Sequence, residues 1–426
     1  MHGYHFVPQS SYNNPALIPD GKVIVGIPVL SSIAHTTYSK FGFNDFFQEK
    51  SDSLYLDLNK VISKSDKANM IAEYVEHDLI LIGLKIQKNY LNFGIRNRLY
   101  SRITYSEGLL KLIWNGNLSY IDEKLDLSST SVSHDHFLDY YAGFAFKINE
   151  NIGLGVRAHY LQGLSSIETQ RNNISIITSS EGDNGFNFDA NASFLINTSG
   201  LVYDSTDGFR FNDYAFNFTN SGFSFDIGAE IKINERVNVT LSIIDLGKIN
   251  WKSNLKSFES ESENVKFSGI TVDIDSQDDI FEQYADSISE LIDVKEFEAS
   301  FSTSLPTRVY TGLEYYSLDR KNRISLLMAG LFMKEKFIPS VSVGFDRDVS
   351  KHFAFKVNYS YLPYSPLNLG AGFSFNFKPF QFYFLTDNIF STFLWDSQRY
   401  FNLRLGINIL IPEQNSIPKG EPVFRK

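Results

Sequence analysis

Apolar and polar side chains alternate strictly over many short stretches of this chain. In 223–233, Phe, Ile and Ala stand at the odd positions, and Ser, Asp, Gly, Glu and Lys stand between them. The turn 234–236 follows, and the alternation resumes from Val237 to Ile243. A period of two makes one face of a strand apolar and the other polar, so the pattern predicts an antiparallel hairpin.

The same pattern recurs in stretches of roughly the 9–11 residues that a tilted membrane strand requires. These stretches are 142–148, 152–160, 353–361, 367–377 and 401–409. Short turns and long connecting segments also alternate along the chain. The turns fall at 88–89, 149–151, 234–236, 318–322, 346–351 and 378–379, and the long segments are 40–78, 105–136, 163–221, 247–298 and 388–398. This asymmetry is typical of membrane barrels, so we expect an all-β, transmembrane antiparallel β-barrel of about 14 strands, within a range of about 14–16.

The composition of the polar faces indicates which side of the sheet points outward. Those faces are rich in Gly, Ser and Asn, which fill little space. A closed sheet of this size needs its centre filled, unless the lumen is watery or plugged. We therefore expect small polar residues inside and Phe, Leu and Ile toward lipid. The alternative is a soluble two-sheet sandwich that presses its apolar faces together.

Three parts are expected along the chain. Residues 1–21 form an N-terminal segment that enters the lumen, residues 22–410 form the barrel, and residues 411–426 form a flexible periplasmic tail. Gly153 and Gly155 lie on a polar strand face, where glycine lets a plug or a neighbouring backbone approach. Short helices are expected in the long extracellular loops, over 54–75, 106–114 and 275–294.

Composition narrows the class of protein further. Phe (38) and Tyr (23) raise the aromatic fraction to 15%, and such residues favour strands and the membrane–water boundary. The absence of cysteine excludes disulfides and thiolate metal sites. A net charge of −10 argues against a nucleic-acid surface. Because the chain starts without a basic, apolar leader, we expect that a signal peptide has been removed.

Several motifs in order along nearly the whole chain resemble one family. They are Asn14-Pro15-Ala16-Leu17, Asp245-Leu246-Gly247-Lys248, Leu305-Pro306-Thr307, Asn368-Leu369-Gly370 and Asn402-Leu403-Arg404-Leu405-Gly406. They resemble the FadL-like superfamily of outer-membrane barrels, and within it the DUF5723 type of Bacteroidota, which is related to the PorV-type barrels of type IX secretion. The resemblance implies a fourteen-stranded barrel in the bacterial outer membrane with Asn14, Pro15 and Ala16 in a plug. It implies no particular ligand.

Candidate ligand-binding residues lie on the polar strand faces. Arg157 and His159 share one such face, and Asp226 and Glu230 share another. With Arg404 in the last strand, these are our candidates for lumen residues that contact a ligand, with Arg157 and His159 able to favour anions. The alternative is that they are ordinary lumen residues in hydrogen-bonded pairs, with Asp226 or Glu230 as partners of the cations.

The sequence gives weaker support for metal binding and for catalysis. The His134-Asp135-His136 sequence offers two imidazoles, but in a strand Asp135 would point to the opposite face, so we favour a solvated loop over a metal site. The carboxylates of 273–282 lack the spacing of a calcium loop and favour a solvated helix. We predict no catalytic residue, no metal and no cofactor, and therefore a protein that is not an enzyme.

The sequence thus favours a FadL-like outer-membrane barrel. It either binds or passes a small apolar ligand, or serves as a barrel subunit of an envelope or secretion assembly. Its expected partners are outer-membrane lipids, a small hydrophobic ligand and larger envelope proteins. The alternatives are a secreted or periplasmic soluble β-protein with a binding role, and an outer-membrane lipid-modifying enzyme. The enzyme would need a histidine beside a nucleophile, and the eight histidines are scattered.

Overall fold

One large antiparallel sheet closes on itself as a barrel of fourteen described strands. The computed structural model describes residues 6–50, 53–180, 187–200, 214, 216–267, 292–334, 336–363, 365–393 and 399–412. In order around the barrel, the wall consists of β1 (Val23–Gly26) and β2 (Ile33–Ser39) as one interrupted strand, β5 (Asn69–Ile86), β6 (Asn89–Tyr105), β8 (Ser131–Lys147), β9 (Ile152–Ser179), β11 (Ser221–Lys232), β12 (Val237–Trp251), β16 (Thr307–Tyr316), β17 (Asn322–Met333), β18 (Lys336–Asp348), β19 (Phe353–Leu362), β20 (Ser365–Phe377), β21 (Phe380–Thr386) and β22 (Tyr400–Ile411).

The first and last strands pair with each other and close the barrel. Val23 lies opposite Ile411 and Ile33 lies opposite Leu405, both in antiparallel register. Closure removes the unpaired edge that an open sheet would expose. The predicted all-β, antiparallel barrel is confirmed, and the two-layer sandwich is wrong because the described strands form one continuous wall.

The outer face of the wall is apolar and the inner face is polar. Phe225 and Ile227 are 54% and 55% exposed, whereas Asp226 between them is 1% exposed. The same alternation holds in β17, where Ile324 and Met328 are exposed and Ser325 is buried. The predicted hairpin over 223–243 is confirmed by the register of β11 with β12.

The two ends of the barrel differ in their connections. At one end, adjacent strands are joined by the short turns 87–88, 148–151, 233–236, 317–321, 349–352 and 378–379. The start of β1 and the end of β22 lie at this short-turn end, since Val23 pairs with both Leu84 and Ile411. At the other end most connections are long, as the sequence predicted, but β17 and β18 are joined through 334–335 and β19 and β20 through 363–364.

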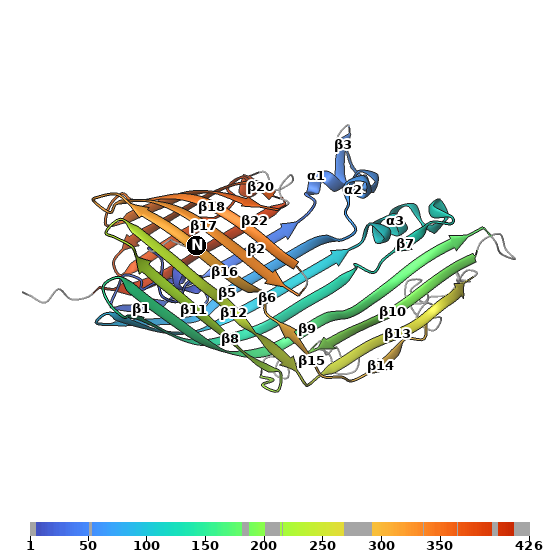
Figure 1. Cartoon of the computed structure of the whole chain (residues 1–426), viewed down its shortest axis with the longest axis horizontal. Helices are drawn as coiled ribbons and strands as arrows, with labels where there is room; N and C mark the ends of the chain where they lie inside the picture. Colours follow the sequence, from blue (N-terminus) through green and yellow to red (C-terminus); the bar gives the residue numbers. More distant parts are fainter. Residues whose placement is uncertain are drawn as a thin grey trace, which may run out of the picture.

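A one-sided sheet extension continues from the long-loop end (Figure 1). The distal half of β9 pairs with β10 (Asn187–Ser199), which pairs with β13 (Leu255–Phe267). The short strands β7 (Lys124–Asp126), β14 (Lys295–Phe297) and β15 (Phe301–Ser304) complete it. The prediction that 163–221 is one long loop is therefore wrong. The strict alternation ends here while the strands continue. Apolar residues follow one another in β10 (Phe194, Leu195 and Ile196), and on the face that continues the inward side of β9, Arg171 bonds Glu259 and Glu261 of β13 at 2.9 and 3.1 Å.

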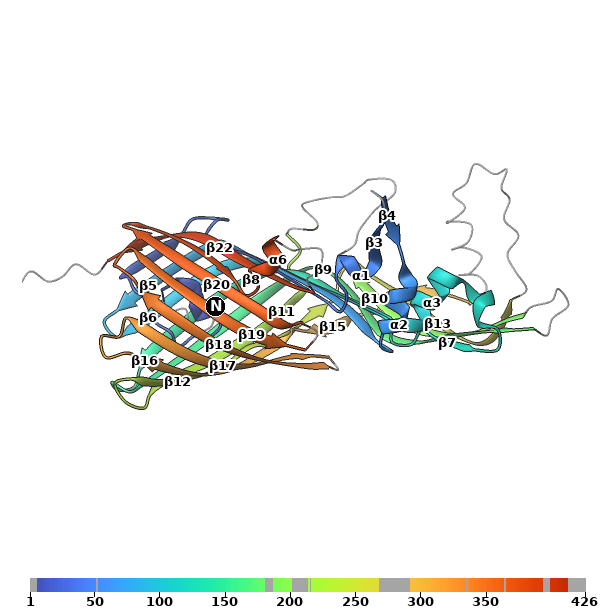
Figure 2. The same cartoon turned by 90° about the horizontal axis from the view of Figure 1, so that it is seen from above.

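Small helices lie beside this extension (Figure 2). They are α1 (Phe43–Phe46), α2 (Leu58–Lys64), α3 (Glu107–Asn115) and the 3-10 helix η2 (Asn117–Tyr120), with the hairpin of β3 (Phe47–Lys50) and β4 (Ser53–Leu56) next to α1. The helix α6 (Phe390–Phe393) lies instead at the mouth of the barrel, next to β22 (Figure 2). The side chain of Ser106 caps α3 by accepting from the amide of Leu109 at 3.0 Å, and the helix predicted over 106–114 is confirmed. None of the described helices has the length and apolar character needed to cross a membrane.

The helix predicted over 54–75 is mostly wrong. Only Leu58–Lys64 is helical, because Asp57 caps its start and Ser65 takes an extended conformation at its end. From Asn69 onward the chain pairs with β6 instead. The helix expected over 275–294 lies almost entirely outside the described residues, and so does the tail after Pro412.

Candidate functional site in the lumen

The N-terminal segment, residues 6–18, lies inside the barrel. It contains the 3-10 helix η1 (Pro8–Tyr12), all of whose residues are buried. Pro8 suits a first helical turn, where no intrahelical amide bond is needed. The Gln9 side-chain amide donates to Asn408 Oδ1 on β22 at 2.9 Å, and the Tyr12 hydroxyl donates to Asp78 Oδ2 on β5 at 2.8 Å. The segment is therefore attached to the inner wall by buried polar contacts.

Two glycines in the wall make room for the backbone of this segment. A Cβ at Gly155 would lie 2.2 Å from the carbonyl of Pro15, and one at Gly228 would lie 2.0 Å from Asn14 Oδ1. Gly153, in contrast, has nothing closer than 3.9 Å. For Gly153 and Gly155 the sequence predicted a close approach of a plug or a neighbouring backbone, and only Gly155 makes one. The plug candidates Asn14, Pro15 and Ala16 are the residues that these glycines admit.

A buried network of ion pairs fills the lumen beside the segment. Its pairs are Arg98 with Asp139 (2.9 Å) and Asp245 (2.6 Å), Arg96 with Glu76 (3.0 Å), Arg404 with Glu76 (2.9 Å), and Arg157 with Asp226 (3.3 Å). Buried charges are tolerable only when they are paired and their remaining hydrogen-bonding capacity is used. Here each guanidinium bonds carboxylates from other strands, so the network ties one side of the barrel together across its interior.

The structure brings three of the predicted lumen residues together. His159 lies between Asp139 (Nδ1–Oδ1, 2.7 Å) and Asp226 (Nε2–Oδ2, 3.0 Å), and Arg157 also bonds Asp226. Arg157 further donates to the backbone carbonyl of Ser11 at 3.1 Å, which connects this group to the N-terminal segment. These residues occupy the paired arrangement that was the alternative to ligand contact.

The remaining two candidates lie elsewhere. Arg404 bonds Glu76 and reaches Ser32 at 3.3 Å. Glu230 stands apart from the network and accepts from Asn238 at 3.3 Å. A ligand-binding role for any of the five stays a prediction.

Sequence reasoning missed the centre of the network. Arg96 and Arg98 are buried on β6, and Asp139 is buried on β8. Arg96 and Arg98 share the inward parity of Asn92 and Tyr100, so extending the alternation through 89–105 would have placed both guanidinium groups in the lumen. Their partners come from distant strands, which no local pattern reveals.

An aromatic cluster packs next to the network. Its buried members are Tyr100, Phe137, Leu161, Ile249, Trp251, Phe301 and Leu305. The ring of Trp251 lies over Gly163, where an added Cβ would be 2.5 Å from the indole, and its Nε1 donates to Thr303 at 3.0 Å. The side of the lumen lined by β6, β8, β9 and β12 is therefore filled with side chains.

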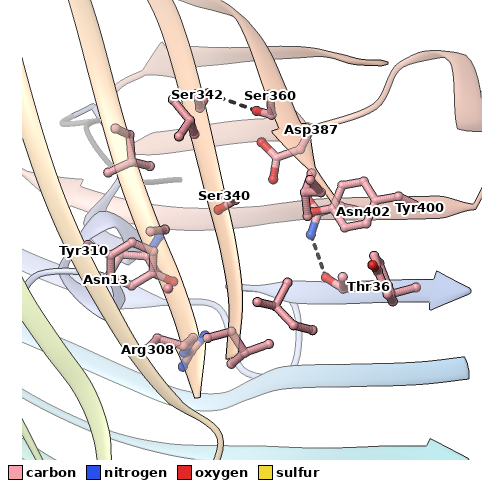
Figure 3. A pocket seen from close by; sticks show the side chains of 18 of the residues that line it. Asn13, Thr36, Arg308, Tyr310, Ser340, Ser342, Ser360, Asp387, Tyr400 and Asn402 are labelled. Carbon is pink, nitrogen blue, oxygen red and sulfur yellow. Dashed lines mark hydrogen bonds between the residues drawn. The ribbon is translucent and has the colours of Figure 1, made fainter. Parts of the chain in front are cut away.

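The opposite side of the lumen holds a cavity of about 310 Å³, which we call the outer cavity. Its apolar wall comes from β17, β18 and β19, with Leu327, Ala329, Leu331, Ile338 and Leu362. Its polar side includes Arg308, Arg404, Tyr310, Tyr400 and Asn402, several of which Figure 3 shows around the empty space. Hydrogen bonds order part of this lining, from Ser360 to Ser342 at 2.9 Å and from Asn402 to Thr36 at 2.6 Å.

A second cavity, the inner cavity, lies at the short-turn end and measures about 410 Å³. Residues of both signs line it, among them Asp20, Lys147, Glu230, Lys232 and Arg320. Leu17 and Ile18 contribute to this cavity, while Asn13 contributes to the outer one. The N-terminal segment therefore stands between the two cavities.

The histidine pair of the sequence lies within β8 rather than in a solvated loop, which corrects that expectation. Asp135 is buried and accepts from Ser166 at 2.8 Å and Thr303 at 3.0 Å, while the His136 ring bonds Asn97 at 2.7 Å. Hydrogen-bonding partners on neighbouring strands keep this stretch in the sheet. Within the described ranges, no group of three or more His, Asp or Glu side chains is placed to hold a metal ion.

Comparison with known proteins identifies a family but no curated relative. A model of the DUF5723 family, a family of unknown function, matches residues 15–387. No curated protein matches the chain in sequence.

Among solved structures, the chain is similar to a FadL homologue of Pseudomonas aeruginosa (12% identity, 96% of this chain and 95% of that one, TM-score 0.47). It is also similar to the toluene transporter TbuX of Ralstonia pickettii (8% identity, 95% and 94%, TM-score 0.46) and to the toluene transporter TodX of Pseudomonas putida (10% identity, 95% and 92%, TM-score 0.43). Likeness at this level does not identify a ligand.

Proposed function

The chain belongs to the DUF5723 family of unknown function, and on that premise we propose that it is a FadL-like outer-membrane barrel. In this proposal the outer cavity takes up a small, largely apolar ligand that carries one anionic head. The observation that carries the proposal is the asymmetric lining of that cavity.

The exposed apolar belt supports a place in a membrane. Phe223, Phe225 and Ile227 follow one another on the outer face of β11 and are all more than half exposed. Each such side chain costs about 1.5–3 kcal/mol to keep in water, and hydrocarbon removes that cost. A soluble β-protein would leave this face in water, so the belt argues against that alternative. With the short turns on the periplasmic side, both ends of the barrel wall lie in the periplasm.

The chemistry of the ligand follows from the two sides of the outer cavity. Leu327, Ala329 and Leu331 on β17 offer an apolar surface. Facing them are the guanidinium groups of Arg308 and Arg404, which pair with Asp245 and Glu76 and still keep 22% and 13% of their side-chain surface exposed toward the cavity. The volume is at the small end of the usual range of ligand sites, roughly 300–1,000 Å³. An alkyl or aromatic body with an anionic group matches these features.

A cavity-filling variant tests this function. Ala329→Trp places an indole in the outer cavity, and its matched control, Ala371→Trp, places the same ring on the lipid-facing side of β20. We expect dodecanesulfonate to bind the wild-type barrel in nanodiscs with saturation, and Ala329→Trp to weaken this binding roughly tenfold or more. Ala371→Trp should bind like the wild type. Calorimetry measures both, and equal affinity for the two variants would contradict the proposal.

The headgroup is tested separately with a ligand of opposite charge. Dodecyltrimethylammonium has the same chain and a cationic head, so Arg308 and Arg404 should repel it. We expect its affinity to be roughly tenfold below that of dodecanesulfonate. If the two ligands bind equally well, the cavity selects for the apolar body alone.

A second candidate function is that of a barrel subunit in an envelope assembly, such as one of the type IX secretion kind. It is favoured by exposed apolar side chains beside the sheet extension: Leu54 (62%), Tyr55 (53%), Ile113 (66%) and Leu118 (55%). The double variant Leu54→Glu with Ile113→Glu should release a stoichiometric partner from native membranes while dodecanesulfonate binding is unchanged. If this variant releases no partner protein from the membranes, the assembly role is contradicted.

A further inference from the structure

We infer that a ligand passes from the outer to the inner cavity beside the N-terminal segment, which stays in place. The passage follows strands β16 to β19 and is closed by four charged side chains, Glu314, Arg323, Asp346 and Lys356, which we call the gate cluster. This inference rests on the proposed function, since it concerns the route of the same ligand.

The gate cluster forms the partition between the two cavities on this side of the barrel. Glu314 and Lys356 line the outer cavity, whereas Arg323 and Asp346 line the inner one. Two pairs cross from one cavity to the other, Arg323 to Glu314 at 3.6 Å and Lys356 to Asp346 at 3.5 Å. A third pair, Arg323 to Asp346 at 3.0 Å, joins the two residues of the inner side. Removing these side chains would join the two spaces.

The N-terminal segment is held by the other side of the barrel. Phe6 accepts from Gln381 of β21 at 2.6 Å, Gln9 bonds Asn408 of β22, and Tyr12 bonds Asp78 of β5. Ser11 bonds Arg157 of β9, and Asn14 donates to the carbonyl of Ala229 on β11 at 3.1 Å. Ser242 of β12 also donates to the carbonyl of Asn13 at 2.5 Å. The attachments therefore run around the wall from β21 to β12, and the gate cluster stands on the remaining arc. Moving the segment would leave several of these buried groups without partners, which is costly.

The gate cluster is built to rearrange without movement of the backbone. Its contacts are between the ends of long side chains that project from regular strands. Gly344 lies beside Lys356, whose Cε would be 3.3 Å from an added Cβ, so the lysine has room where another residue would stand. From the inner side, the Tyr316 hydroxyl donates to Glu314 Oε2 at 2.9 Å. When these side chains turn aside, the space between the two cavities opens for a ligand.

The first experiment opens the gate. In proteoliposomes that contain fluorescently labelled albumin, uptake of dodecanesulfonate is measured for the wild type and for Arg323→Ala. We expect uptake by Arg323→Ala to be roughly fivefold faster, because the shortened side chain joins the cavities. The matched control, Arg347→Ala, removes an arginine from the outward face of the same wall and should behave like the wild type. Unchanged uptake by Arg323→Ala would overturn the inference.

A second variant, in the lining of the outer cavity, keeps the inference testable if Arg323→Ala does not fold. Ser342→Trp narrows the outer cavity next to the gate cluster and should slow uptake roughly fivefold. If Ser342→Trp leaves uptake unchanged in a barrel that is folded, the passage does not run along β18, and the inference fails on that result alone.

The second experiment fixes the N-terminal segment. The chain has no cysteine, so Gln9→Cys with Asn408→Cys introduces the only two thiols, at side chains whose amides now meet. A short bismaleimide bridges them, and each single-cysteine variant is the control. We expect the bridged protein to take up dodecanesulfonate within about twofold of the unbridged one. Loss of most uptake on bridging would show that the segment must move and would overturn the inference.

Binding measurements separate this inference from the proposed function. If dodecanesulfonate does not bind the wild-type barrel, both proposals fall. If it binds and the Ala329→Trp variant weakens this binding, the proposed function holds, and Arg323→Ala, Ser342→Trp and the bridged protein decide the route.

Discussion

The two sides of the lumen share one outer surface but differ completely inside. On the side of β6 to β12, inward positions carry Arg98, Asp139, Arg157 and Asp245, all of which are at most 2% exposed. On the side of β17 to β20, inward positions carry residues such as Ala329, Ser340 and Ser342 around a cavity of about 310 Å³. Both sides show the same apolar alternation outward.

This difference teaches that the alternation decides only where the wall lies. The size and charge of the inward residues decide whether a region of the lumen becomes a packed interior or a site. In the filled region, paired charges and aromatic rings occupy the space and hold the N-terminal segment. In the open region, small residues leave room for a ligand.

The largest effect is expected from breaking the ion network in the filled region. Arg98→Met removes a fully buried guanidinium that pairs with both Asp139 and Asp245, and leaves these two carboxylates with His159 and Arg308 as their remaining partners. Breaking a buried pair on one side costs about 3–5 kcal/mol. Guanidinium titration of the barrel in lipid vesicles, followed by tryptophan fluorescence, measures the free energy of unfolding.

Arg171→Met is the control, because this arginine pairs with Glu259 and Glu261 in the sheet extension and keeps 40% of its side chain exposed. It should cost no more than about 1 kcal/mol. If Arg98→Met and Arg171→Met lower the free energy of unfolding equally, the distinction between the filled interior and the sheet extension is contradicted.

A smaller effect is expected from glycine substitutions on the two sides. In Gly155→Ala, the new methyl group meets the backbone of Pro15 at 2.2 Å, which cannot yield without moving the N-terminal segment. We expect a loss of about 1–3 kcal/mol. In Gly370→Ala the methyl group meets the end of the Asn358 side chain at 2.4 Å, which can turn into the open lumen. The same titration should show a loss below about 1 kcal/mol for that variant, and a reversed order would contradict the comparison.

The smallest effect lies outside both regions, at the loop elements. Asp45 accepts from the amide of Gly42 at 3.0 Å and from Arg399 at 3.3 Å. Burial raises the pKa of its carboxyl group, but the Gly42 amide and the cations Arg399 and Lys64 outweigh burial, so the pKa is lowered. A lowered pKa means that the carboxylate stabilises the fold at neutral pH and that this contribution is lost as the pH falls below about 4.

Hydrogen exchange checks this contribution. Amides of 42–47 should exchange faster at pH 3 than the intrinsic rates explain, by an amount equivalent to less than about 1 kcal/mol. Asp45→Asn should lose this pH dependence while the barrel strands exchange as before. If the faster exchange at pH 3 persists in Asp45→Asn, another group is responsible for it.

The barrel wall was predictable from sequence because each strand in the apolar belt repeats the same two-residue pattern. The hairpin of β11 and β12 could be placed nearly residue by residue. The sheet extension was not predictable, because its strands lack the strict alternation: Phe194, Leu195 and Ile196 are consecutive in β10, and β13 carries charged and hydroxyl side chains on both faces. There the strands are held by their neighbours, which a single stretch of sequence does not show.

The site was predictable only where its members lie on neighbouring strands. Arg157, His159 and Asp226 lie on adjacent strands β9 and β11, and parity alone places them on one face. Arg98 and Asp245 are 147 residues apart, and their contact depends on how the barrel closes. The open cavity has no positive signal at all, since it results from small residues on strands that the fold brings together.

The most direct test of the account is to locate a bound ligand in a crystal by the anomalous scattering of bromine. The barrel is crystallised with 12-bromododecanesulfonate, and the bromine peak is placed in the anomalous difference map. We predict a peak beside Leu327 and Ala329, with the sulfonate toward Arg308 and Arg404. A peak within the ion network of β6 to β12, or only on the outer wall, would contradict the account.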